Sequence, residues 1–149
     1  MRQTIFALCL VFATGAHAQP SGRISPEEAV LRFNNAVRAL DVPTMTAMTD
    51  PEVTAFVSND APRATLRRVH GREALLKLIG AATTAPVPPL AASALQDPEV
   101  QRIGPVAIVT YHIGSGNRVG RRTFVLRETE SGWVVLHQHA STFVTGDAR

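Results

Sequence analysis

Reactive and aromatic side chains are scarce in this sequence. Its 149 residues include one cysteine, one tryptophan and one tyrosine. The cysteine, Cys9, lies in an apolar run that we expect to be cleaved off, so the mature chain should have no disulfide, cysteine nucleophile or cysteine-ligated zinc. A glycine-rich phosphate loop, a G-x-S-x-G elbow and an H-E-x-x-H motif are also missing. Nucleotide hydrolysis, acyl transfer at such an elbow and zinc proteolysis therefore have no support.

Long apolar runs are missing as well. The run at residues 5–13 is about half of the roughly 20 apolar residues that a bilayer span needs. Arg2 precedes it, and Ala16, His17 and Ala18 follow it in the small-x-small pattern of a signal-peptidase site. We therefore expect residues 1–18 to be a signal peptide and residues 19–149 to form a single domain. The mature protein should be periplasmic or secreted, with no membrane attachment after cleavage.

The excess of positive charge is small. Fifteen Lys and Arg face twelve Asp and Glu, which gives a formal net charge of +3. Nucleic-acid binding usually shows a strong basic patch interleaved with aromatic rings, and this chain has few of either. We expect no nucleic-acid partner.

Helix signals gather in the first half of the mature chain. Ser25, Pro26 and Glu28 form a cap, a first helical position and a capping-box acid. Apolar residues then recur at three- and four-residue spacing up to Leu40, which predicts an amphipathic helix. Asp41 predicts the cap of a short second helix that ends at residues 50–51, and residues 71–79 should form a third.

Strand signals dominate the second half. Pro98 marks an edge or bulged strand, and the short glycine-containing connections after it imply antiparallel neighbours. The predicted strands are residues 53–57, 65–69, 92–103, 106–113, 121–130 and 133–144. Helices followed by hairpin-joined strands predict an α+β fold, with N-terminal helices packed on a strongly curved antiparallel sheet.

This order of elements resembles the nuclear transport factor 2-like superfamily, a cone in which the first helix closes over a bent sheet. Within it, the chain is similar to the association (hub) domain of calcium/calmodulin-dependent protein kinase II and its stand-alone, SnoaL-like bacterial relatives. The resemblance spans nearly all of the predicted mature chain. The residues that carry it are Met48, Thr49, Asp50 and Pro51; Thr54, Ala55 and Phe56; Val69, His70 and Gly71; Asp97 and Pro98; Ile103 and Gly104; Thr123; Gly132 and Trp133; and His137, Gln138, His139, Ala140 and Ser141.

The resemblance implies a domain that forms dimers or rings, has a pocket in the cone and, in the kinase hubs, has no catalytic role. In those hubs an arginine directly after the strand threonine helps to bind carboxylates. Phe124 stands at that position here. Carboxylate specificity is therefore in doubt, although Arg122 and Arg127 lie on the same predicted strand and could partly substitute.

The last predicted strand carries the main candidate chemistry. His137 and His139 are two residues apart, so both imidazoles should project from the same face. We expect that face to line the hollow of the cone, with His112 or Tyr111 alongside. The alternative is that the imidazoles bond to neighbours or face a dimer interface. The predicted pocket comprises Tyr111, His112, Arg122, Phe124, Trp133, His137 and His139.

Three other interpretations bear on this pocket. His137 and His139 could bind a metal with His112 or Glu128 as third ligand, but the sequence has no signature beyond H-x-H, and we expect no metal and no cofactor. Trp133, beside a turn glycine, should pack under the sheet edge rather than stack on a ligand. Arginines such as Arg68 should be solvated, unless Arg68 or Arg122 points inward to bind an anion.

These observations favour an exported, non-catalytic domain for small-molecule binding or oligomerisation. We expect a homodimer, formed through the sheet, and a ligand that is a small organic anion or an apolar molecule. The alternative is a small cofactor-free isomerase or hydro-lyase with His137 or His139 as general base. The resemblance supplies precedents for it in ketosteroid isomerase-like and scytalone dehydratase-like members. Fold alone does not decide between the two.

Overall fold

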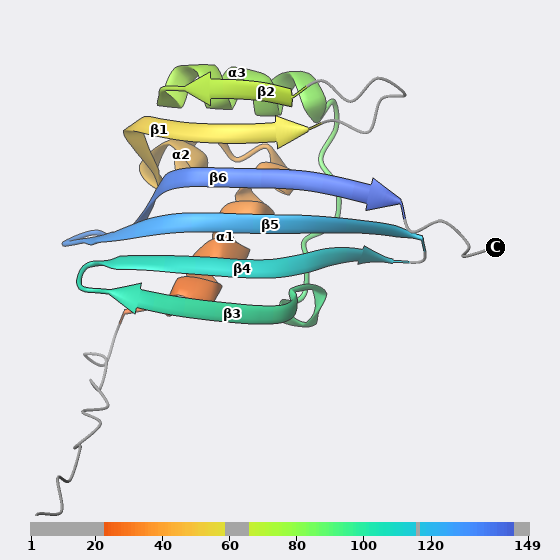
Figure 1. Ribbon diagram of the computed structural model, residues 1–149. Helices are drawn as coiled ribbons and strands as arrows, with labels where there is room; N and C mark the ends of the chain where they lie inside the picture. The colour runs from red at the N-terminus through yellow and green to blue at the C-terminus, as the bar shows by residue number, and fades with distance from the viewer. Residues whose placement is uncertain (1–22, 59–65, 116, 145–149) are drawn as a thin grey trace, which may run out of the picture.

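The computed structural model describes residues 23–58, 66–115 and 117–144 (Figure 1). Three α-helices and six strands follow one another with a short 3-10 turn between them. The predicted signal peptide, residues 1–18, lies outside the described residues. Within the described part of the chain, no helix is both long and apolar enough to cross a bilayer.

Local capping signals place the helices as predicted. Helix α1 spans Pro26–Ala39, and the Ser25 hydroxyl accepts a hydrogen bond from the backbone N–H of Glu28 at 3.2 Å. Leu40, with a φ of 57°, adopts the left-handed conformation that ends the helix. Helix α2 spans Val42–Ala47 and is capped by Asp41, and α3 spans Arg72–Ala82. Helix α2 ends before the predicted residues 50–51 because the chain enters a strand at Thr49.

The six strands form one open sheet in the order β2-β1-β6-β5-β4-β3. Their bounds are β1 Thr49–Ser58, β2 Leu66–His70, β3 Gln96–Ile103, β4 Val106–Ser115, β5 Arg118–Thr129 and β6 Gly132–Val144. Strands β3, β4, β5 and β6 pair antiparallel in series, as their short connections predict, and β1 and β2 are also antiparallel, but β1 runs parallel to β6. The sheet is therefore mixed, because residues 59–131 separate these two strands in the chain and no tight turn fixes their direction.

All three helices cover one face of the sheet, which we call the inner face. In Figure 1 the strands pass in front of α1 and α2, and no described element lies in front of the strands. The core forms between this face and the helices, with Phe33 of α1 against Phe124 of β5 at a ring-centroid distance of 5.8 Å. The opposite face, which we call the outer face, is not covered by any described element.

The start of β3 is irregular, as Pro98 predicts for an edge strand. The pairing with β4 shifts between Gln96 and Glu99, and Asp97 has a φ of 48°. Residues 92–94, predicted to belong to this strand, instead form the 3-10 turn η1, Ala92–Ala94. The strand is consequently shorter than expected and begins at Gln96.

A second irregularity, in β6, decides which side chains face inward. Val135 pairs with Leu126 of β5, whereas His137 pairs with the adjacent Val125, so Leu136 is one residue extra. A bulge of this kind reverses the alternation of side chains beyond it. Trp133 and Val135 face inward before the bulge, and Gln138 and Ala140, rather than the histidines, face inward after it.

Candidate functional site

The bulge at Leu136 separates the predicted pocket residues onto two faces of the sheet. Tyr111, Phe124 and Trp133 lie on the inner face and are at most 4% exposed. Arg122 shares that face, since it pairs with Tyr111 of β4 and Ala140 of β6. His112, His137 and His139 lie on the outer face. The structure thus does not bring the seven predicted residues into one pocket.

Our expectation that the β6 histidines project into the hollow of the cone is wrong. His137 pairs with Val125 and Thr54, and His139 pairs with Thr123 and Phe56, all on the outer face. The residue between them, Gln138, points inward instead. Its Oε1 atom is buried and has no hydrogen-bond partner among the described residues.

Aromatic side chains fill the inner face beside Gln138. The rings of Tyr111 and Phe124 stack at a centroid distance of 6.2 Å, and Phe124 is fully buried. The Tyr111 hydroxyl accepts a hydrogen bond from the Asn34 side-chain amide at 2.9 Å. Burial raises the pKa of Tyr111 to about 12, which the Asn34 hydrogen bond and the Arg122 charge only partly offset. Tyr111 is therefore neutral at physiological pH and cannot serve as a base.

Arg122 points inward, as expected for an arginine that binds an anion inside the cone. Its guanidinium, however, donates hydrogen bonds to backbone carbonyls. Nη1 donates to the carbonyl oxygens of Ser141 at 2.8 Å and Arg121 at 3.0 Å. The side chain lies over Gly120, where an added Cβ would meet Nη1 at 2.8 Å. Glycine at this position therefore gives the arginine room to lie flat on the sheet.

Trp133 packs under the sheet edge, as predicted. It is 4% exposed, and its indole N–H donates to the Ile24 carbonyl oxygen at 3.0 Å. The guanidinium of Arg102 lies 5.0 Å from the centre of its ring, in the range of a cation–π contact. The Glu128 carboxylate forms two ion pairs beside this ring. Its Oε1 lies 3.0 Å from Arg23 Nη1, and its Oε2 lies 3.3 Å from Arg102 Nη2. The Glu128 carboxylate is therefore occupied by two arginines.

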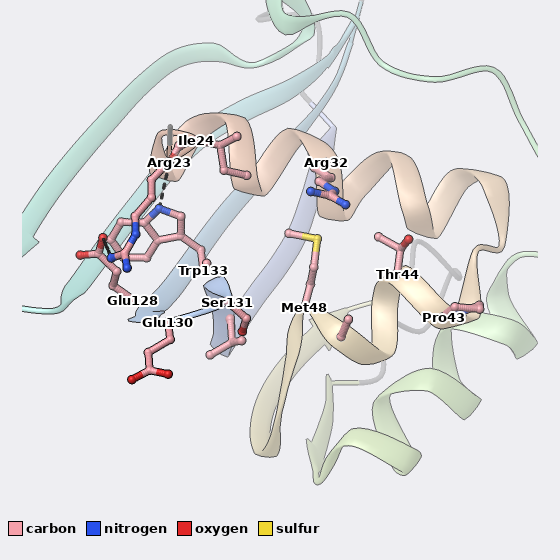
Figure 2. Close-up of a pocket in the computed structure, with 13 residues that line it drawn as sticks. Arg23, Ile24, Arg32, Pro43, Thr44, Met48, Glu128, Glu130, Ser131 and Trp133 are labelled. Atoms are coloured by element: carbon pink, nitrogen blue, oxygen red, sulfur yellow. Dashed lines mark hydrogen bonds and ion pairs between the residues drawn. The ribbon is translucent and has the colours of Figure 1, made fainter. Parts of the chain in front are cut away.

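A groove opens between α1, α2 and the β5–β6 turn, beside Trp133 (Figure 2). It has a volume of about 580 Å³, within the roughly 300–1,000 Å³ typical of small-molecule sites. Met48 and Ile24 contribute apolar surface, and the guanidinium groups of Arg23 and Arg32 lie along it. No motif in the sequence predicts this groove, because residues far apart in the chain build it.

The outer face carries all four histidines of the described residues. His137 Nδ1 lies 2.8 Å from the Thr54 hydroxyl oxygen. Burial, and then the neighbouring His139, lower the pKa of the His137 imidazole. The other two histidines lie towards opposite edges of the sheet. His70 Nε2 is 3.5 Å from Glu52 Oε2, and His112 Nδ1 is 3.7 Å from Asp97 Oδ2.

This histidine-rich face does not assemble a metal site within one chain. Among residues 23–58, 66–115 and 117–144, no three histidine, cysteine, aspartate or glutamate side chains gather as a metal site would require. Glu128, weighed as a third ligand, lies on the inner face and so cannot join His137 and His139. What the face offers instead is a set of imidazole, arginine and half-exposed aromatic side chains.

Apolar rings on the outer face are partly open to solvent. Phe56 is 36% exposed and Phe143 is 38% exposed, and Val125 on β5 is half-buried on the same face. An arginine lies over each ring. The guanidinium carbon is 5.0 Å from the ring centre in both cases, for Arg68 over Phe56 and for Arg121 over Phe143. Arg68 therefore lies on the outer face, not inside the cone.

Comparison with solved structures gives the same fold. The CaMKII hub of S. rosetta is 26% identical with a TM-score of 0.54, and the match covers 80% of this chain and 98% of the hub. An NTF2-like protein of unknown function from Pseudomonas putida is 22% identical with a TM-score of 0.58, over 76% of this chain and 81% of that one. A candidate dehydratase of the NTF2-like family from Streptomyces avermitilis is 19% identical with a TM-score of 0.60, over 78% and 92%.

The sequence itself gives a family assignment. It matches no curated protein. The family profile of the SnoaL-like domain matches residues 27–145, which include every described helix and strand except the first residue of α1. The chain therefore belongs to the SnoaL-like domain family and has the α+β cone fold of NTF2-like proteins.

Proposed function

We propose that this protein is an exported, non-catalytic assembly domain that pairs with a second copy of itself through the outer face of its sheet. The observation that carries the proposal is this uncovered face, on which Phe56 and Phe143 are partly exposed and Val125, on the central strand β5, is half-buried. Apolar surface that no element of the chain covers favours association with another chain. The similarity to hub domains, which assemble into dimers or rings, supports the same conclusion.

The inner face supports a structural role rather than acid–base catalysis. No described histidine faces the interior, and the Glu128 carboxylate at its rim already binds two arginines. Tyr111 is held neutral by burial and bonds Asn34. A general base needs a titratable group within reach of a bound substrate, and the described inner face does not supply one.

The proposal is tested by the mass of the purified mature protein at micromolar concentration. We expect a dimer for the wild type and a monomer for Val125→Lys, because a charge at the centre of the outer face must lose its water on pairing. The matched control is Ala81→Lys, an exposed position on α3 that should leave the dimer intact. A wild type that remains monomeric would refute the proposal.

Activity provides a second test. The wild type should not turn over enolisable or dehydratable substrates. Turnover that disappears in His139→Ala, with the circular dichroism spectrum unchanged, would instead support the isomerase or hydro-lyase alternative.

The groove of Figure 2 favours small-molecule binding as an additional function of the same domain. Arg32 is exposed on one wall, and the Met48 and Ile24 side chains supply apolar surface, so a small organic anion with an apolar body fits its chemistry. A carboxylate library should contain members that raise the melting temperature of the wild type but not that of Arg32→Ala. If no member raises it, this addition is wrong.

A further inference from the structure

The register of the sheet points to one arrangement of the two copies. We propose that the two-fold axis runs along the strands, between β6 and β5, so that Arg68 of each copy pairs with Glu99 of the partner subunit. This inference rests on the proposed function, because it specifies how the outer faces meet. It follows from where the sheet places its unpaired charges.

Arg68 and Glu99 lie at opposite ends of one line of side chains across the outer face. Each step of the line is a pair of directly opposed residues on neighbouring strands. Side chains of opposed residues project from the same face of a sheet. The line, from the β2 edge to the β3 edge, reads Arg68, Phe56, His139, Thr123, Thr110 and Glu99.

The two edges of the outer face carry opposite charge. The β2 edge presents Arg68 and His70, whereas the β3 edge presents Asp97 and Glu99. Arg68 and Glu99 are both exposed, and neither makes an ion pair with any described residue. Arg68 is held only against the Phe56 ring, at 5.0 Å. Each edge thus has a charge available to a partner.

Two-fold symmetry allows two simple ways to lay these faces together. An axis across the strands would place each strand over its own copy, so that Arg68 would meet the Arg68 of the partner subunit. An axis along the strands, between β6 and β5, places β2 over the partner's β3, β1 over its β4 and β6 over its β5. Like charges in an interface are costly, whereas opposite charges fix its register. Charge complementarity therefore selects the axis along the strands.

The ordinary spacing of packed sheets is compatible with this arrangement. Packed sheets lie about 10 Å apart, a gap that an arginine and a glutamate side chain can bridge together. The same axis places Phe56 over Thr110 of the partner subunit and His139 over Thr123 of the partner subunit. These central contacts combine an aromatic ring, an imidazole and threonine methyl groups, so no cation meets another along the line.

Exchanging the two charges tests this register. Arg68→Glu and Glu99→Arg, each alone, should raise the dimer dissociation constant at least tenfold at low salt, because each places like charges at two symmetric contacts. The two variants mixed should form a heterodimer as tight as the wild type, since both contacts are then of opposite charge. The double variant R68E/E99R should also regain wild-type affinity. Sedimentation equilibrium measures these constants, and high salt should reduce the differences.

Arg67→Glu is the matched control. Arg67 neighbours Arg68 on β2 but pairs with Val57 on the inner face, so its reversal should leave dimer affinity unchanged. If Arg68→Glu and Glu99→Arg dimerise as tightly as the wild type, the register is wrong while the proposed dimer stands. If, in addition, the mixture of the two variants forms a heterodimer tighter than the wild-type dimer, the axis across the strands is correct. A monomeric wild type would refute both proposals.

Discussion

The two faces of the sheet are built from the same strands and differ in what covers them. The inner face is closed by three helices, and its central side chains, such as Phe124 and Val135, are almost fully buried. The outer face holds partly exposed rings, arginines and histidines with no described element over them. The inner face therefore serves stability, whereas the outer face keeps side chains that are available for interaction.

The assignment of side chains to these faces depends on Leu136. Deleting it should cause the largest effect, because either Trp133 and Val135 or Gln138 and Ala140 must then leave the inner face. We expect loss of the cooperative thermal transition. Leu136→Ala, which keeps the residue count, should still unfold cooperatively. A deletion variant as stable as the wild type would contradict the role of the bulge.

Truncating one aromatic ring on each face should give a smaller but clear contrast. Phe124→Ala should lower the free energy of unfolding by about 3–5 kcal/mol, because the ring is fully buried against Phe33 and Tyr111. Phe56→Ala should cost about 1 kcal/mol or less in the monomer, since its ring is already 36% exposed. Urea unfolding below the dimer dissociation constant measures both. Equal losses would show that the faces do not differ as described.

The smallest expected effect concerns pH. The folded-state pKa of His137 is lowered, first by burial and then by His139, so the unfolded chain binds a proton more readily. The contribution of His137 to stability is therefore complete above its ordinary pKa of about 6.5 and falls as the pH drops through that value. His137→Gln should unfold with a weaker dependence on pH between about 7 and 5 than the wild type. An unchanged dependence would argue against this environment for His137.

Much of the fold could be predicted from the sequence because its signals are local. Ser25, Pro26 and Glu28 mark the start of α1, and glycine turns separate the last three strands. The parallel pairing of β1 with β6 could not be predicted, because it joins segments that no short connection links. For the same reason the groove beside Trp133 escaped prediction, although Trp133 itself was correctly interpreted as a packing residue.

The site prediction failed at one identifiable point. Residues 133–136 are Trp, Val, Val and Leu. Because all four are apolar, the alternation of polar and apolar residues does not indicate which of these side chains face the core. The extra residue at Leu136 therefore cannot be detected from the hydrophobic pattern of this run. The shared face of His137 and His139 was correctly inferred from their spacing, but the identity of that face was not. The alternative was that the imidazoles bond to neighbouring residues or face an interface. The hydrogen bond between His137 and Thr54 agrees with the first part of this alternative.

Carbethoxylation of His139 as a function of protein concentration, read by mass spectrometry, tests most directly whether the outer face carries this imidazole and receives a second copy. Exposed Lys77 on α3 serves as the internal reference. We predict that His139 reacts readily in dilute, monomeric protein and becomes protected as the dimer forms, while Lys77 does not change. A His139 that is unreactive at every concentration would place the imidazole inside the cone, and one that is equally reactive at every concentration would leave the outer face without a partner; either result would contradict the account.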